Sequence, residues 1–506
     1  MTETDSSTTE HRHRPGSRLP PRRAPVDLEV AVIGAGFGGI GMAVALRRAG
    51  IDNFAIFEKA SDLGGVWRDN TYPGCNCDVP AHLYSFSFAP YRDRHTRYPG
   101  QQAILEYLRR IAEDEGLEPH LRLGTGIREA TYLEAQGRWA LTTDTGHRIL
   151  TDSVVFAVGQ LHRPNIPDIR GRHAFEGAAF HTARWDHNQD LTDRAVAVIG
   201  TGSSAAQILP YLAATARHIE VFQRNPHWVL PKPALRFGPV TSGALRLPGA
   251  HRAYRAGLHH GADLALSPIM RRGWSARPAE WIARTHLRRQ VPDPQLRARL
   301  TPSYPIGAKR IILDNDFYSA LSQPHVSLVT APIQDMTREG IRTVDGEHHH
   351  AEVVVWATGF RASEFLSGLS VRGRDGVLLA EQWRDGASAF AGLAVPGFPN
   401  LYLIAGPNTF NPAGSNPEMK EAQIAYITKC LRWRDETGAT AIEVDTDIAQ
   451  EYDWRIQQAL AHTVFGTVRR SWYRHVSGAV TNPWPGSVRQ FERFLRHPVA
   501  ESFHPR

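Results

Sequence analysis

The chain has 506 residues, 42% of them hydrophobic, which is enough for two or three domains with an extensive core. Its 58 basic and 51 acidic residues give a formal charge of +7, with arginines concentrated in the N-terminal tail and at about 252–310. No module interleaves basic and aromatic residues as nucleic-acid-binding modules do, so we expect anionic cofactors instead. Three cysteines are too few for a disulfide framework or a tetrahedral zinc site.

The first 27 residues are polar and rich in proline and arginine, which predicts a disordered tail without the apolar core of an export signal. The apolar run 28–46 holds glycines where a strand must turn into a helix, so it predicts no membrane span. We expect a cytoplasmic protein without a metal site. The histidine run 348–350 is assigned to a turn between strands.

From residue 28 the sequence pattern predicts a strand, a glycine turn, a helix and a second strand. Gly34, Gly36 and Gly39 form GxGxxG, with Gly38 in the same turn, and this pattern lets the backbone approach a pyrophosphate at a helix N-terminus. Glu58 follows Gly34 by 24 residues, where a carboxylate accepts hydrogen bonds from a ribose diol. The alternative is a glycine-rich turn that binds nothing.

The same order of elements returns at residue 195 and predicts a second pyrophosphate cradle. Its residues are Gly200, Thr201, Gly202, Ser203 and Ser204. The following strand lacks the acid that selects NAD, and Arg224 stands 24 residues after Gly200. A guanidinium suits a 2′-phosphate, so we expect NADPH; the alternative is a surface arginine flanking a strand.

Together these units predict an α/β fold with two Rossmann-like dinucleotide-binding domains, one interrupting the other. We assign 28–160 to the first part of one domain and 361–506 to its second part with the C-terminal segment. Residues 161–360 form the other domain. Within it, the Arg- and Ala-rich stretch at about 241–304 has helical spacing and predicts a helical insertion. The oligomeric state is not predicted.

Segments after the first unit resemble those that wrap FAD in the flavin-containing and Baeyer-Villiger monooxygenases. They contain Gly64, Gly65, Val66 and Trp67, then the run YPGCNCD ending at Asp78, then Tyr84. The resemblance implies that Gly65, Val66, Trp67 and Tyr84 bind FAD and that Asp78 lies near the flavin ring. The alternative for Asp78 is a turn-capping aspartate. The two cysteines of the run are separated by a single residue, which argues against dithiol chemistry.

Residues 175–186 read FEGAAFHTARWD and resemble the Baeyer-Villiger fingerprint FxGxxxHxxxW followed by Pro or Asp. The specified residues are Phe175, Gly177, His181 and Trp185. Related N-hydroxylating and S-oxidising flavin monooxygenases usually carry a different aromatic residue in place of the tryptophan. In the family this motif lies in the linker between the two cofactor domains, which implies a role in domain coordination rather than in acid–base chemistry.

The segment 304–310, YPIGAKR, is similar to the family stretch that ends in the active-site arginine. The resemblance implies that Arg310 stabilises developing negative charge, that Asp78 positions it, and that Lys309 helps to bind NADPH. The alternative is a basic helical patch. Trp472 resembles a family tryptophan that closes over bound NADP, the alternative being a core tryptophan.

The resemblance implies an enzyme that uses FAD, NADPH and O2 to insert one oxygen atom next to a ketone carbonyl through a C4a-peroxyflavin, giving an ester or lactone. One alternative is an N- or S-oxygenating monooxygenase of the same superfamily. Others are a nucleotide-binding reductase or redox sensor, and a nucleic-acid binder that uses the insertion. Residues 406–414, GPNTFNPAG, depart from the family's usual glycines and His-Asn pair, which leaves the substrate open.

Overall fold

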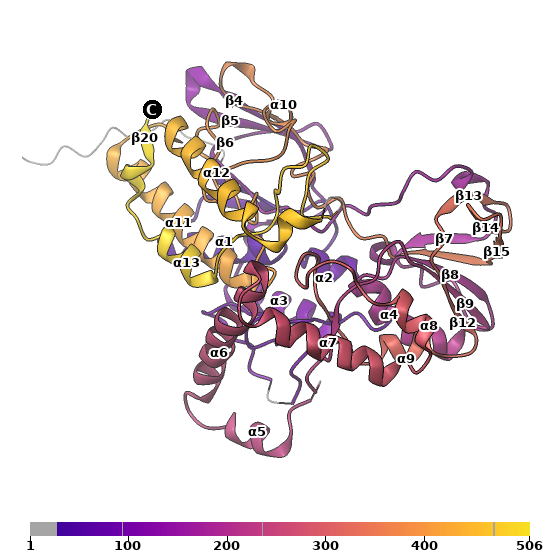
Figure 1. The fold of residues 1–506 in the computed structure, drawn as a ribbon. Coiled ribbons are helices and arrows are strands. Elements are labelled where there is room, and N and C mark those ends of the chain that lie inside the picture. The colour runs from indigo at the N-terminus through magenta and orange to yellow at the C-terminus, as the bar shows by residue number, and fades with distance from the viewer. Residues whose placement is uncertain (1–27, 94, 235, 469–470) are drawn as a thin grey trace, which may run out of the picture.

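The computed structural model describes residues 28–93, 95–234, 236–468 and 471–506. The predicted tail, residues 1–27, lies outside the described residues. Figure 1 shows two sheets side by side, the strands of the second at the right and the helices of the insertion below. The predicted α/β class with two Rossmann-like units is confirmed.

The first sheet has eight strands in the order β17-β4-β5-β6-β1-β2-β3, with β18 also paired to β6. Its strands are β1 (Leu28–Ile33), β2 (Phe54–Phe57), β3 (Leu121–Arg122), β4 (Ile127–Leu133), β5 (Arg138–Thr143), β6 (Arg148–Phe156), β17 (Ser370–Arg372) and β18 (Leu401–Leu403). Strand β1 pairs in parallel with β2 and β6, and it is buried along most of its length because helices and loops cover both faces. Since β17 and β18 follow residue 361, two distant parts of the chain build this sheet.

The second sheet is entirely parallel, in the order β12-β9-β8-β16-β7. Its strands are β7 (Ala178–His181), β8 (Ala195–Ile199), β9 (His218–Phe222), β12 (Val326–Val329) and β16 (Val353–Trp356). Beside it lies an antiparallel sheet of β13 (Ile333–Thr337), β14 (Gly340–Thr343) and β15 (His348–His350). The turn assignment for the histidine run was therefore wrong: it is a strand, with His349 buried and hydrogen-bonded to Glu220 at 2.9 Å.

Helices cover both sheets. They are α1 (Phe37–Ala49), α2 (Val66–Asp69), α3 (Gln101–Asp114), α4 (Ser203–Thr215), α9 (Phe317–Leu321), α10 (Leu379–Gln382), α11 (Asn416–Thr437), α12 (Thr446–Ala461) and α13 (Val488–Phe494). The insertion contains α5 (Pro239–Ala244), α6 (Ala250–Gly261), α7 (Ala276–Gln290) and α8 (Pro294–Arg299). Two short strand pairs complete the fold, β10 (Val229–Leu230) with β11 (Ile312–Leu313) and β19 (Ile442–Val444) with β20 (Phe503–Pro505). Of the described helices, none combines the length and the apolar character needed to cross a bilayer.

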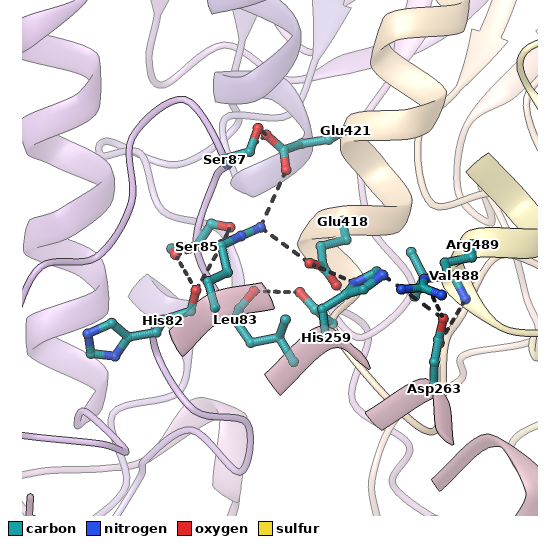
Figure 2. A network of polar contacts seen from close by, with 12 residues as sticks. His82, Leu83, Ser85, Ser87, His259, Asp263, Glu418, Glu421, Val488 and Arg489 are labelled. Atoms are coloured by element: carbon teal, nitrogen blue, oxygen red, sulfur yellow. Dashed lines mark hydrogen bonds and ion pairs between the residues drawn. The ribbon is translucent and has the colours of Figure 1, made fainter. Parts of the chain in front are cut away.

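A polar network fixes helix α6 of the insertion to helix α11 of the first unit (Figure 2). His259 contacts Glu418 at 3.3 Å, and Arg255 reaches Glu418 at 3.5 Å and Glu421 at 3.8 Å. The Arg255 guanidinium also donates to the backbone oxygens of His82 and Ser85 at 2.9 and 2.8 Å. Because Arg255 and Glu418 are largely buried, these contacts hold the insertion in one place on the first unit.

Candidate active site

The first cradle lies where β1 turns into α1, and its glycines are required sterically. Gly34 has φ +105°, and a Cβ there would lie 2.7 Å from the carbonyl oxygen of Ala157. A Cβ on Gly39 would lie 1.8 Å from the carbonyl oxygen of Gly34. The turn therefore tolerates only glycine at these positions, and it directs the free amides at the start of α1 toward the adjacent cavity.

This cavity has a volume of about 340 Å³ and reaches from Glu58 to Phe410. Seven residues predicted to bind FAD line it: Gly34, Gly36, Gly38, Glu58, Gly65, Val66 and Tyr84. Gly36 and Gly65 face each other so closely that a Cβ on Gly65 would lie 3.2 Å from the Cα of Gly36. A side chain at either position would narrow the space over the N-terminus of α1, so the residues present fit a dinucleotide whose pyrophosphate lies against the backbone.

Glu58 and Tyr84 are held in place by the surrounding chain. The Glu58 carboxylate accepts hydrogen bonds from the amides of Ala35 and Ala60, both at 3.0 Å, and pairs with Arg68 at 3.1 Å. Trp67 is not a lining residue; its indole donates to the Tyr84 hydroxyl at 3.2 Å. Trp67 therefore supports the wall of the cavity from behind.

The second cradle repeats this geometry between β8 and α4. Gly200 has φ +114°, and a Cβ there would lie 2.4 Å from the carbonyl oxygen of Ala357. Gly202 precedes the helix that Ser203 and Ser204 begin, and a Cβ at Gly202 would meet no atom within 4 Å. Thr201 is buried and donates to the carbonyl oxygen of Asn225 at 3.3 Å. The space beside Gly202 at the N-terminus of α4 is therefore unobstructed.

Three basic residues gather beside the second cradle. Burial and the nearby Arg224 lower the pKa of Lys309 to about 8. Burial, Lys309 and Arg224 lower the pKa of His227 to about 4, and its Nδ1 atom is buried without a hydrogen-bond partner. Within the described parts of the chain no carboxylate forms an ion pair with Arg224 or Lys309. This cluster has the composition of an anion site, and His227 is a member that the sequence did not reveal.

Arg310 and Asp78, which are 232 residues apart in the chain, form a close ion pair. The Nη2 and Nε atoms of Arg310 donate to one carboxylate oxygen at 2.6 and 3.1 Å. Burial raises the pKa of Asp78, but Arg310 and Lys232 outweigh it and hold the pKa below its ordinary value. Burial also opposes the charge on Arg310, yet Asp78 keeps the pKa of the guanidinium above its ordinary value. Both groups are therefore charged at any working pH.

Phe410 connects this ion pair to the first cavity. The Arg310 guanidinium lies 5.4 Å from the centre of the Phe410 ring, which lines the cavity. Trp472 packs edge-on against the same ring at 4.9 Å between centroids. The fold thus brings three predicted residues, Asp78, Arg310 and Trp472, to the end of the cavity opposite Glu58. Phe410 belongs to the segment that departs from the family pattern.

Comparison with known proteins decides the family. Residues 31–246 match the family described as pyridine nucleotide-disulphide oxidoreductase. A Baeyer-Villiger monooxygenase of Streptomyces coelicolor is 40% identical over 478 residues, which cover 93% of this chain and 91% of the relative. This chain belongs to the Baeyer-Villiger monooxygenases. The resemblance seen in the motifs is confirmed.

Solved Baeyer-Villiger structures share the whole fold. The structure of OTEMO in complex with FAD and NADP is 26% identical, with a TM-score of 0.85 over 95% of this chain and 100% of that one. Cyclohexanone monooxygenase from Rhodococcus sp. Phi1 bound to NADP⁺ is 28% identical, with a TM-score of 0.84 over 96% of this chain and 100% of that one.

In this Baeyer-Villiger monooxygenase the fingerprint histidine makes two backbone contacts. His181 accepts a hydrogen bond from the Ala183 amide at 3.0 Å through Nδ1, and its Nε2 atom lies 2.9 Å from the Gly359 carbonyl oxygen. Burial lowers the pKa of His181 to about 4, so the neutral ring donates through Nε2. Gly177 is required because a Cβ there would lie 2.3 Å from the Glu352 carbonyl oxygen. Through His181 the motif connects the end of β7 to Gly359, which follows strand β16 of the second sheet.

Two further fingerprint residues pack around this point. The Trp185 ring meets Phe180 edge-on at 4.9 Å, and Phe175 packs against the buried cluster that contains Trp356. Neither ring lies in the cavity of the first unit. This placement supports the expectation that the fingerprint coordinates the domains, which stays a prediction.

Two basic residues near the cavity escaped the sequence analysis. Lys420, on α11, lines the cavity together with Met419 and Gln423, and burial lowers its pKa to about 8. Lys232 donates to the carbonyl oxygen of Cys77 at 3.1 Å and thereby holds the loop that carries Asp78. No sequence pattern indicated either residue, because each approaches the site through contacts between segments far apart in the chain.

Proposed function

We propose that this Baeyer-Villiger monooxygenase binds FAD in the first cradle and NADPH in the second, and inserts one atom of O2 next to a ketone carbonyl. The ketone, O2, NADPH and a proton give an ester or lactone, NADP⁺ and water. The observation that carries the proposal is the placement of two consecutive residues. Lys309 lies beside Arg224 at the second cradle, and Arg310 lies over Phe410 at the first cavity. One short segment therefore reaches both cofactor sites.

When bound and reduced by NADPH, FAD supplies the reaction with O2, and the protein supplies binding, orientation and charge. The Arg310 guanidinium stabilises the negative charge that develops on the carbonyl oxygen of the ketone during oxygen insertion. Asp78 fixes the orientation of Arg310 through the ion pair at 2.6 Å. Phe410 and Trp472 give the same region apolar walls, which suits a substrate without charge.

The basic cluster at the second cradle supports NADPH rather than NADH. Arg224 and Lys309 are two cations without an acidic partner in the described chain, and a 2′-phosphate supplies the missing negative charge. The NADPH ribose phosphate is therefore the group that we assign to Arg224, Lys309 and His227.

The Arg310→Ala variant tests the catalytic assignment. We expect it to retain FAD and to oxidise NADPH, but ester formation falls by about 100-fold or more, because the developing charge loses its main stabilising group. Gas chromatography of the ester and an assay of hydrogen peroxide measure how far NADPH oxidation is uncoupled from ester formation. An exposed arginine away from the site, changed in Arg148→Ala, serves as the control. Unchanged ester formation in Arg310→Ala would remove Arg310 from the catalytic role.

A further inference from the structure

The positive charge of this protein is concentrated in the insertion. Residues 241–304 hold eleven arginines, no lysine and three acids, a formal charge of +8, while the whole chain carries +7. Exposed arginines in this segment form no ion pair within the described parts of the chain: Arg246, Arg252, Arg272, Arg277, Arg288 and Arg289. Such an unneutralised, one-sided charge attracts a polyanionic partner.

The insertion and the residues just before it also expose large apolar side chains. Among the described residues, seven of the thirteen exposed large hydrophobic side chains lie between 239 and 283. They are Val240, Leu247, Leu264, Leu266, Trp274, Trp281 and Ile282. Trp274 and Trp281 are 67% and 64% exposed, which is unusual for tryptophan in a soluble fold. Clustering of such residues in one segment marks an interaction surface.

Helix α7 shows how charge and apolar side chains are arranged. Its inner face is buried through Ala279, Ala283 and Leu287. On the outer face of α7, Arg277, Trp281 and Arg288 are exposed at spacings of four and seven residues, and Arg272 and Trp274 are exposed just before the helix. We call these five residues the Arg-Trp surface. Figure 1 shows α5, α6 and α7 at the lower edge of the molecule, away from the first sheet.

We propose that the insertion docks on an anionic lipid membrane through the Arg-Trp surface. Tryptophan prefers the boundary between headgroups and acyl chains, and arginine binds lipid phosphates while its stem stays in the apolar layer. Helices with basic and aromatic or leucine side chains on their exposed face lie in that boundary. A polynucleotide would satisfy the arginines but would offer nothing to the exposed leucines, isoleucine and valine, so the composition favours lipid. This proposal is independent of the reaction proposed above.

Sedimentation with lipid vesicles tests the proposal on the FAD-loaded full-length protein. We expect it to pellet with vesicles of phosphatidylglycerol and phosphatidylcholine and to stay in solution with phosphatidylcholine alone. Removing charge in Arg277→Gln/Arg288→Gln should weaken vesicle binding about fivefold for each arginine. Removing the apolar anchors in Trp274→Ser/Trp281→Ser should weaken binding at least as much. The tryptophan fluorescence of the protein should shift to shorter wavelength on binding, and this shift should be lost in Trp274→Ser/Trp281→Ser.

Matched controls separate the surface from general effects of charge or folding. Trp454→Ser removes a tryptophan that is 62% exposed on α12, and Arg122→Gln/Arg148→Gln removes two exposed arginines outside the insertion. Both controls should bind vesicles like the unchanged protein, and all variants should unfold at the same temperature. Equal binding to neutral vesicles, or unchanged binding by the Arg277/Arg288 variant, would overturn the proposal. Binding of duplex DNA without binding of anionic vesicles would overturn it in favour of nucleic acid.

Discussion

Arg224, His227 and Lys309 place three basic groups against one another at the second cradle. Burial and the neighbouring cations lower the pKa values of Lys309 and His227 and disfavour their charged forms unless an anion lies between them. Arg224 was predicted as a phosphate-binding residue from its distance along the sequence to Gly200. A regular βαβ unit sets that distance between the glycine turn and the end of the second strand. His227 and Lys420 could not be found in this way, since their burial depends on segments that meet only in the folded chain.

The Arg224→Ala variant tests the cofactor assignment at this cluster. We expect the preference for NADPH over NADH, measured as the ratio of kcat/KM values, to fall by about 10–100-fold, because a charge-assisted hydrogen bond is lost. Arg217→Ala is the control: this exposed arginine pairs with Glu352 in the same domain, and its removal should leave the ratio unchanged. A ratio that does not change in Arg224→Ala would refute the phosphate assignment.

Helix α6 meets helix α11 through His259, and this contact depends on protonation. The pKa of His259 is raised by its hydrogen bond to Glu418, with Asp263 and Glu492 adding to the effect and burial opposing it. Arg255, on the same helix, contacts Glu418 as well. Since α11 carries Met419 and Lys420 at the first cavity, this contact links the insertion to the cofactor site.

Because the pKa of His259 is raised in the folded protein, the protonated ring stabilises the fold. This stabilisation is complete below the unfolded-state pKa of about 6.5 and is lost as the pH rises through the folded-state pKa. His259→Gln should therefore lower the free energy of unfolding by about 1–2 kcal/mol at about pH 6, and by less at about pH 9. Urea unfolding across this range measures the difference.

His260→Gln removes the exposed neighbouring histidine and should have little effect on stability at any pH. A difference between the unchanged protein and His259→Gln that stays constant or grows with pH would show that the His259–Glu418 contact does not titrate as expected.

Elements with strong local signals were predicted well, and elements that depend on pairing partners were not. The glycine turns, the first and second βαβ units and the helical insertion follow from residue spacing and steric requirements. The histidine run was misassigned because a strand such as β15 is defined by its partner β14 rather than by its own propensity. The contact between α6 and α11 had no sequence signal, because polar side chains on two helices do not reveal that they will meet.

The segment 304–310 connects the two units of the molecule, because Lys309 lies near Arg224 of the second unit and Arg310 lies over Phe410 at the cavity of the first. The first sheet contains strands from residues 28–156 and from residues 370–403, and the second unit is inserted between them. The sequence predicted the two Rossmann-like units, and the structure brings Asp78 and Arg310 together as an ion pair; their role in the reaction stays a prediction. It did not predict the packing of Phe410 between Trp472 and Arg310.

The most direct test of the account is to follow the fate of labelled oxygen. The FAD-loaded protein is supplied with NADPH, ¹⁸O2 and a panel of cyclic and aryl ketones, and the products are analysed by mass spectrometry. We expect an ester or lactone with one labelled oxygen, formed in an amount equal to that of the NADPH consumed. Labelled N-oxide or sulfoxide from amine or sulfide substrates, with no ester from any ketone, would contradict it, as would NADPH oxidation that yields only hydrogen peroxide.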